Sequence, residues 1–126
     1  VRILRRSLDW YNWVGIYLEK EDRLVLEAYA GDVETEHVSI PIGQGICGFA
    51  ARTGETVVVP DISRDPRYLM CFPSTRSEIV VPIRGKRGVI GEIDIDSDKP
   101  AAFSKSDEMF LEAATRQLAS YLEKRL

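Results

Sequence analysis

Three acidic residues in the second half of the chain alternate with apolar residues, as side chains on one face of a β-strand do. Glu78 lies in one such run, and Asp94 and Asp96 lie in the next. If the two runs form a hairpin centred on Lys86, Glu78 faces Asp94, and Asp96 lies on the same side. Carboxylates in a covered pocket would bind an ammonium group and could keep one carboxyl protonated near neutral pH. A solvated sheet face accounts for the same pattern, so both interpretations stay open.

The two cysteines could carry redox chemistry. Cys47 follows a glycine-rich turn and begins a predicted helix, where backbone N–H groups and the helix dipole favour a thiolate. Cys71 lies in a loop shortly before Ser77, so this loop could lie over the acid-bearing strand. Both thiols could then meet at one pocket, although an unreactive, partly buried thiol is the commoner state of a free cysteine. The sole histidine, His37, is more typical of a surface group than of a catalytic base, because no partner can be assigned to orient it.

Composition places the chain among ordinary globular domains. Its 126 residues are 44% hydrophobic and 29% charged, which fits a single domain over 1–126 and excludes a disordered chain. The net charge of -3 argues against nucleic acid as a partner. One histidine and two widely spaced cysteines cannot form a Cys/His zinc site, and we expect neither a metal nor a cofactor. No apolar run is long enough to span a bilayer and no leader is evident, so we expect a cytoplasmic protein in which a transient disulfide is favoured over a permanent one.

Local patterns predict the elements that must position these residues. In chain order they are a truncated helix over 1–9, strands over 13–18, 23–30 and 37–41, a helix over 43–54, strands over 56–59, 77–83 and 89–96, and a helix from 105 onward. Gly54 is a typical residue after a helix end, and Ser104 with Asp107 resembles a capping box. The five-residue segment 84–88 joins the last two strands. This order predicts an α+β fold with an antiparallel sheet.

The same patterns predict which side chains face the core. In the last hairpin, alternation predicts a core face made of Ile79, Val81, Ile83, Val89, Ile93 and Ile95. Val80 and Ile90 then lie on the other face, among the acids. In the closing helix, the apolar face is expected to contain Phe110, Ala114, Leu118, Tyr121 and Leu122.

Several of these segments together resemble a GAF domain, and more narrowly the free methionine-(R)-sulfoxide reductases. The segments that carry the resemblance are 40–50, 68–71, 77–83, 90–97 and 103–107, and the likeness runs from about Trp13 to the C-terminus. It implies a GAF-like, PAS-related fold, with a central antiparallel sheet, helices on one face and a loop-covered ligand pocket on the other. The acids would then lie on the pocket side.

The resemblance also implies roles for individual residues and a partner. Cys71 matches the nucleophilic cysteine of that family, and Cys47 matches a second cysteine that can join a disulfide. The acids Glu78, Asp94 and Asp96 match those that bind the substrate amine and the sulfoxide oxygen, and Trp13 and Tyr17 match aromatic residues at the methyl end of the pocket. Thioredoxin is the expected reductant, and no metal is implied.

One position departs from the family pattern. The family usually has a further cysteine before the segment 40–41, and this chain has His37 there. Cys47 could take over the disulfide step, or the chain could be a non-catalytic GAF sensor that binds a small amine or amide. A dimerisation module built on the amphipathic terminal helices is a third possibility, and a homodimer is compatible with all of them.

Overall fold

An antiparallel sheet forms the centre of the computed structural model, which describes residues 1–2, 10–31, 38–66 and 74–124. The described sheet has six strands in the order β3-β2-β1-β6-β5-β4. The strands are β1 (Trp13–Lys20), β2 (Arg23–Gly31), β3 (Ser39–Pro41), β4 (Val57–Val59), β5 (Ser77–Gly85) and β6 (Gly88–Ser97), and the helices are α2 (Gly45–Thr53), the short 3-10 helix η1 (Ile62–Arg64) and α3 (Lys105–Glu123). The predicted α+β class with an antiparallel sheet is confirmed.

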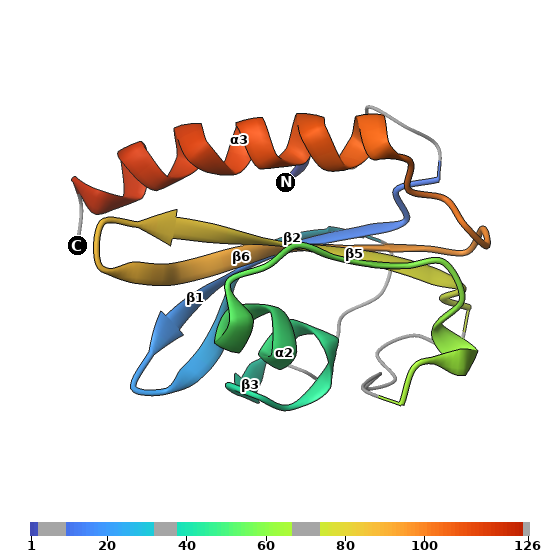
Figure 1. The fold of residues 1–126 in the computed structure, drawn as a ribbon, viewed down its shortest axis with the longest axis horizontal. Helices are drawn as coiled ribbons and strands as arrows, with labels where there is room; N and C mark the ends of the chain where they lie inside the picture. Colours follow the sequence, from blue (N-terminus) through green and yellow to red (C-terminus); the bar gives the residue numbers. More distant parts are fainter. Residues whose placement is uncertain (3–9, 32–37, 67–73, 125–126) are drawn as a thin grey trace.

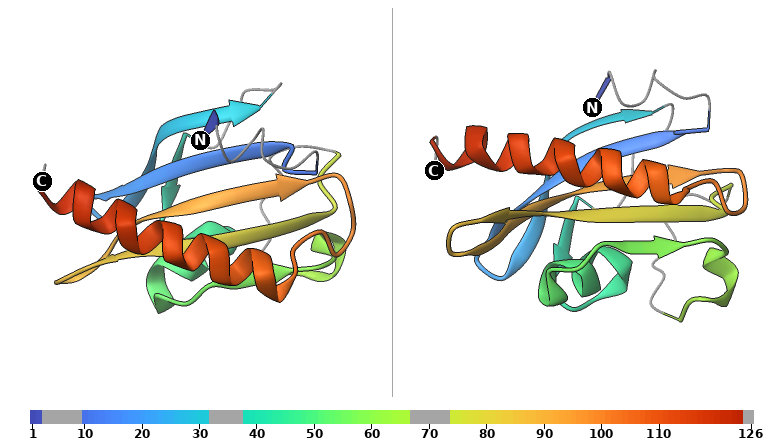
Figure 2. Two further views of the ribbon diagram at one scale, coloured as in Figure 1. Left: turned by 90° about the horizontal axis from the view of Figure 1, so that it is seen from above. Right: turned by 45° about the horizontal axis from the view of Figure 1, so that its top comes forward.

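The two α-helices lie on opposite faces of this sheet (Figure 1). The long helix α3 covers one face, and α2 lies against the other, as the turned views also show (Figure 2). Side chains therefore form two apolar clusters, one around Ile79, Ile95 and Leu111 and one around Tyr17 and Ile46. The resemblance implied helices on one face only, but α2 packs on the face opposite α3. Among the described residues, no helix has the length and apolar character that a membrane span requires.

The start of α3 follows the predicted capping box, but its buried face differs from the prediction. The Asp107 N–H donates to Ser104 Oγ at 3.3 Å, and the Ser104 N–H donates to Asp107 Oδ2 at 2.7 Å. Of the five residues expected to face the core, Phe110 is 59% exposed and Tyr121 is 53% exposed. The fully buried positions are Leu111, Thr115 and Ala119, with Leu118 and Leu122 partly buried beside them. The helix face that packs on the sheet is therefore rotated from the predicted one, and helical periodicity alone did not identify it.

The register of the last hairpin differs by two residues from the expected one. Glu78 lies opposite Asp96, and Asp94 lies opposite Val80. The predicted pairing of Glu78 with Asp94 is wrong because the two-residue turn between Gly85 and Gly88 shifts the register by one residue and an extra residue on β6 shifts it by one more. A shift of two residues keeps every side chain on its face, so the acids stay together.

A bulge in β6 reverses the facing of the residues next to the turn. Ile83 pairs with Gly91 and Arg84 pairs with Val89, so Ile90 is an extra residue on β6. As a result, Val89 packs against the cluster on the α2 side and Ile90 packs against the cluster on the α3 side. The sequence predicted the reverse for both residues, because strict alternation does not anticipate a bulge.

Candidate active site

The three predicted acids lie under α2 and are shielded from solvent. Glu78 lies on β5, and Asp94 and Asp96 lie on β6, at positions that alternate with the isoleucines packed against α3, so the three acids are on the opposite face of the sheet. Their exposed fractions are 3%, 1% and 2%. The alternative of a solvated sheet face is therefore wrong. Buried carboxyls side by side must be protonated or meet a cation or hydrogen-bond donors, because isolated charges are costly to bury.

The glycine-rich turn brings Cys47 to these acids. Gly43 and Gly45 adopt positive φ angles of 96° and 70°, a conformation that glycine adopts without strain. A Cβ on Gly48 would lie 2.7 Å from the Pro41 carbonyl oxygen, so only glycine lets α2 approach this closely. Cys47 is the third residue of α2 and is 6% exposed.

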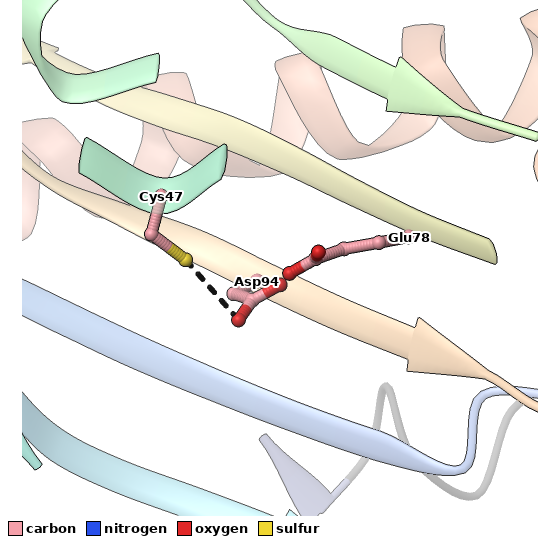
Figure 3. A group of neighbouring side chains, drawn as sticks. All are labelled: Cys47, Glu78 and Asp94. Atoms are coloured by element: carbon pink, nitrogen blue, oxygen red, sulfur yellow. Dashed lines mark hydrogen bonds between the residues drawn. The ribbon is translucent and has the colours of Figure 1, made fainter. Parts of the chain in front are cut away.

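The Cys47 thiol points from α2 toward β6 (Figure 3). Its Sγ donates a hydrogen bond to Asp94 Oδ2 at 3.3 Å. Glu78 reaches toward the same carboxyl from β5. One donor atom from each of Cys47, Glu78 and Asp94 lies within 4.8 Å of the others. Three segments that are distant in the sequence therefore converge on one buried point.

A fourth acid, Glu92, belongs to the same group, and the sequence analysis did not select it. It lies two residues before Asp94 on β6 and is fully buried. Among the described residues, neither of its carboxyl oxygens has a hydrogen-bond partner. The signal was present in the sequence, because the alternation that places Asp94 and Asp96 on one face extends back to Glu92.

Burial and mutual repulsion keep protons on this group. Burial raises the pKa of Glu92 well above its usual value, and the charge of Asp94 raises it further. Burial and the charge of Asp94 likewise raise the pKa of Asp96. The pKa of the Cys47 thiol is raised by burial and then by the charges of Asp94, Glu92 and Glu78. The expected thiolate at the start of α2 is therefore wrong for the resting protein, because burial among acids outweighs the helix dipole.

Thr75 holds one of the acids in place. Its hydroxyl donates to Asp96 Oδ2 at 3.1 Å, and the residue is 5% exposed. Thr75 precedes β5 in a segment that the sequence predicted only as a loop, and nothing in the local sequence marks it as a contact of Asp96.

The aromatic residues Trp13 and Tyr17 belong to β1 and lie beside the acids of β6. Trp13 pairs with Asp96 across the β1–β6 ladder, and Tyr17 pairs with Glu92. Both aromatic side chains are buried in the cluster that contains Cys47. The Trp13 ring covers Gly15, where a Cβ would lie 2.2 Å from a ring atom, and it stacks on Tyr29 with centroids 6.0 Å apart. Predicted aromatic and acidic residues therefore line one region.

Two residues of the sequence analysis cannot be placed in this way. Cys71 and His37 lie outside the described residues. The predicted approach of Cys71 to the acids stays a prediction, and so does the surface position of His37.

Comparison with known proteins agrees with this architecture. The GAF domain family matches residues 1–122. A free methionine-R-sulfoxide reductase of Escherichia coli is 36% identical over 122 residues, which are 97% of this chain and 70% of that protein.

Two solved structures resemble the chain closely. A type II free methionine-R-sulfoxide reductase from Thermoplasma acidophilum is 45% identical, with a TM-score of 0.93 over 98% of this chain and 86% of that one. A free methionine-R-sulfoxide reductase from Neisseria meningitidis, in complex with its substrate, is 36% identical, with a TM-score of 0.90 over 97% and 72% of the two chains. With nearly its whole length matched in sequence and in fold, the chain belongs to the GAF domain family.

Proposed function

We propose that this chain is a reductase of free methionine-(R)-sulfoxide that works through its cysteines. The observation that carries the proposal is the buried group of one thiol and four carboxyls beneath α2, in a chain whose relatives include enzymes of that name. A sulfoxide reductase needs a sulfur nucleophile and a proton donor in a site that excludes water. The buried acids can serve as the proton donor.

The charge of the site favours a substrate with an ammonium group. Among the residues that the structure describes, the groups that shift the pKa of Cys47, Glu92 and Asp96 are acids, a thiol and a hydroxyl, and none of them is a lysine or arginine. The α-ammonium of a free amino acid would neutralise part of this negative charge. We place the methyl end of methionine sulfoxide against Trp13 and Tyr17, whose buried rings offer the apolar surface nearest to the acids.

In the proposed reaction, the thiolate of Cys71 attacks the sulfoxide sulfur. Asp96, which burial and Asp94 keep protonated, gives its proton to the sulfoxide oxygen. The S–O bond of the substrate breaks as the oxygen is transferred to the Cys71 sulfur, so methionine leaves in the reduced form and Cys71 becomes a sulfenic acid. The Cys47 thiol then attacks this sulfenic acid, which forms a disulfide and releases water. Thioredoxin, in the cytoplasm, would return both thiols by disulfide exchange.

Turnover of separate epimers tests this function. Reduced protein is incubated with the R or the S epimer of free methionine sulfoxide and a thiol reductant, and methionine is measured. We expect R-selective turnover that Cys71→Ser abolishes. Cys47→Ser should still form about one methionine per chain in a single turnover, but should slow thioredoxin-dependent cycling more than tenfold, because the resolving thiol is lost. The absence of R-selective methionine formation would overturn the proposal.

The alternative of a non-catalytic sensor gives a different pattern in the same samples. A sensor would bind a small amine-containing ligand in calorimetry with an affinity that Cys71→Ser leaves unchanged, and would form no methionine. A putative GAF sensor protein from Burkholderia vietnamiensis is 36% identical to this chain, with a TM-score of 0.87. A protein described as a sensor is therefore as similar in sequence to this chain as several of the reductases are.

A further inference from the structure

The mixed thiol and carboxyl group beneath α2 has the composition of a cation site of a particular class. Cys47, Glu78 and Asp94 each offer one donor atom within 4.8 Å of the other two, and all three residues are buried. Carboxylates alone would suit Mg²⁺ or Ca²⁺, but a sulfur donor favours a softer ion such as Zn²⁺. The sequence predicted no metal, because its one histidine and two cysteines cannot form a Cys/His zinc site, but folding assembles a different set of donors.

The separation between the thiol sulfur and one carboxyl oxygen fits a tetrahedral ion. Zn²⁺ bonds of about 2.3 Å to sulfur and about 2.0 Å to oxygen place the two donors about 3.5 Å apart. The Cys47 Sγ and Asp94 Oδ2 atoms are 3.3 Å apart. The pair can therefore hold the ion after only small side-chain shifts, with the metal in place of the thiol proton.

Glu92 is an independent observation that points to a ligand. It is fully buried, and neither of its oxygens has a hydrogen-bond partner among the described residues. Its carboxyl lies beside the Cys47 thiol and interacts with the charge of Asp94. Leaving a buried carboxyl without a partner is costly, and the proposed reaction assigns this residue no role. Glu92 is not among the three residues whose donor atoms lie within 4.8 Å of one another, so its carboxyl must turn toward the ion to supply a fourth ligand.

We propose that Cys47, Glu78, Asp94 and Glu92 form a site for Zn²⁺ or a similar thiophilic divalent ion. An ion there occupies the resolving thiol and the carboxyls that would receive the substrate ammonium. Metal and methionine sulfoxide therefore exclude each other, and the metal inhibits reduction reversibly. Inhibition rests on the proposed function, whereas metal binding does not.

Metal binding is measured first, without substrate. Thiol-reduced, chelator-stripped protein is titrated with Zn²⁺ against a chromophoric chelator, and with Cd²⁺ while the ultraviolet thiolate-to-metal band is recorded. We expect one ion per chain, and no competition from a hundredfold excess of Mg²⁺. Cys47→Ser should abolish the band, and both Cys47→Ser and Glu92→Gln should weaken Zn²⁺ binding more than tenfold, because each removes a ligand.

The control is Glu27→Gln, which removes an exposed carboxyl that lies 4.0 Å from Lys20 on the neighbouring strand. It should bind Zn²⁺ as the unchanged protein does. Circular dichroism checks that each variant folds, and Asp94→Asn replaces Cys47→Ser if the latter does not. The site would be overturned if the protein failed to bind one Zn²⁺ per chain. It would also be overturned if the folded Cys47→Ser and Glu92→Gln variants bound Zn²⁺ as tightly as the unchanged protein.

Turnover then separates the two proposals. With chelator present, reduction of the R epimer tests the reductase alone. Added Zn²⁺ should suppress that activity, excess chelator should restore it, and methionine sulfoxide should weaken Zn²⁺ binding. Activity that saturating Zn²⁺ leaves unchanged refutes the proposed mutual exclusion of metal and substrate and spares the reductase. Zn²⁺ binding by a protein that forms no methionine refutes the reductase and spares the site.

Discussion

At the scale of single residues, the unusual feature is the number of acids in one buried place. Glu78, Glu92, Asp94 and Asp96 are all at most 3% exposed. Most proteins bury a carboxyl only with a cationic partner, because removing a charge from water costs several kcal/mol. Here the groups that perturb Glu92 and Asp96 are mainly other acids. The site is therefore kept partly protonated at a cost to stability, and such a cost is typical of functional sites.

Replacing Glu92 with glutamine should stabilise the fold, and increasingly so as the pH rises. Burial and Asp94 raise the pKa of Glu92 above its usual 4.5. Because the folded-state pKa is raised, the contribution to stability is complete below pH 4.5 and is lost as the pH rises toward the folded-state pKa. The loss is at most about 1.4 kcal/mol per pH unit for one proton. The glutamine side chain of the Glu92→Gln variant carries no charge, so the variant escapes this loss.

Thermal unfolding between pH 4 and pH 8, with chelator present, measures this effect. The melting temperature of Glu92→Gln minus that of the unchanged protein should increase with pH. Glu27→Gln removes an exposed carboxyl in place of a buried one and is the control for this comparison. A Glu92→Gln difference that is constant over this range would show that Glu92 does not hold its proton in the fold.

At the scale of elements, the position of α2 decides whether Cys47 reaches the acids. The helix begins at Gly45 after a glycine-rich turn and ends at Thr53, where Gly54 adopts a φ of 71° and its N–H donates to the Ala50 carbonyl at 2.8 Å. Glycine is needed at the end of the helix for its left-handed conformation and at position 48 for close approach. These two glycines determine how closely α2 can pack against the sheet.

Gly48→Ala should displace α2 and weaken the contact between Cys47 and Asp94. The added methyl would lie 2.7 Å from the Pro41 carbonyl oxygen, so the backbone must shift. We expect a loss of about 1–3 kcal/mol of unfolding free energy, in the range for overpacking. Thioredoxin-dependent turnover should fall more than single-turnover reduction, because only the former uses Cys47.

Urea denaturation and the two turnover assays test this prediction. Arg52→Ala, on the exposed side of the same helix, is the control and should change the unfolding free energy by no more than about 0.5 kcal/mol. A Gly48→Ala protein with unchanged stability would show that α2 is not held this close to the turn before it.

At the scale of the whole molecule, the segment before β1 packs against the start of α3 on the sheet face opposite the site. Tyr11 is 1% exposed and contacts Phe103 with ring centroids 5.6 Å apart. Its hydroxyl donates to Asp107 Oδ1 at 2.7 Å, which joins the segment before β1 to the start of α3. The same Asp107 forms the capping box, so one carboxylate ties together the helix start and the N-terminal segment.

Tyr11→Phe should destabilise the fold at neutral pH, and the effect should fade in acid. A hydrogen bond to a charged group contributes about 1.5–3 kcal/mol. Although burial opposes the shift, hydrogen bonds from Ser104 and Tyr11 lower the pKa of Asp107 below its usual 3.8. Because this folded-state pKa is depressed, the contribution is complete above pH 3.8 and is lost as the pH falls through the folded-state value.

Urea denaturation at pH 7 and at pH 2.5 tests this link. The variant should be less stable than the unchanged protein at pH 7, and the difference should shrink at pH 2.5. Ser120→Ala removes a hydroxyl from an exposed serine on α3 and should change the unfolding free energy by no more than about 0.5 kcal/mol at either pH. Equal stability of Tyr11→Phe and the unchanged protein at pH 7 would contradict the role of the hydrogen bond.

Much of the fold could be predicted because its signals are local. Alternation identified the strands of both hairpins and placed Glu78, Asp94 and Asp96 on one face, since neighbouring side chains of a strand point to opposite sides. Ser104 and Gly54 marked helix ends, since a cap depends on the backbone groups next to it. The motifs around Cys47 and β6 indicated the family. The same alternation contained Glu92, and it was missed only because the acids were counted from Asp94.

Other features depended on contacts between distant segments. The two-residue turn and the bulge at Ile90 placed Glu78 opposite Asp96, and the sheet selected the face of α3 that contains Leu111. The thiol of Cys47 is protonated because α2 presses it against acids from β5 and β6, which outweighs the dipole of its own helix. The sequence by itself determined which residue types share a face, because that follows from backbone periodicity. Only the tertiary structure decided that the acids are buried together with a thiol, because burial and its effect on charge arise when separate elements pack and exclude water.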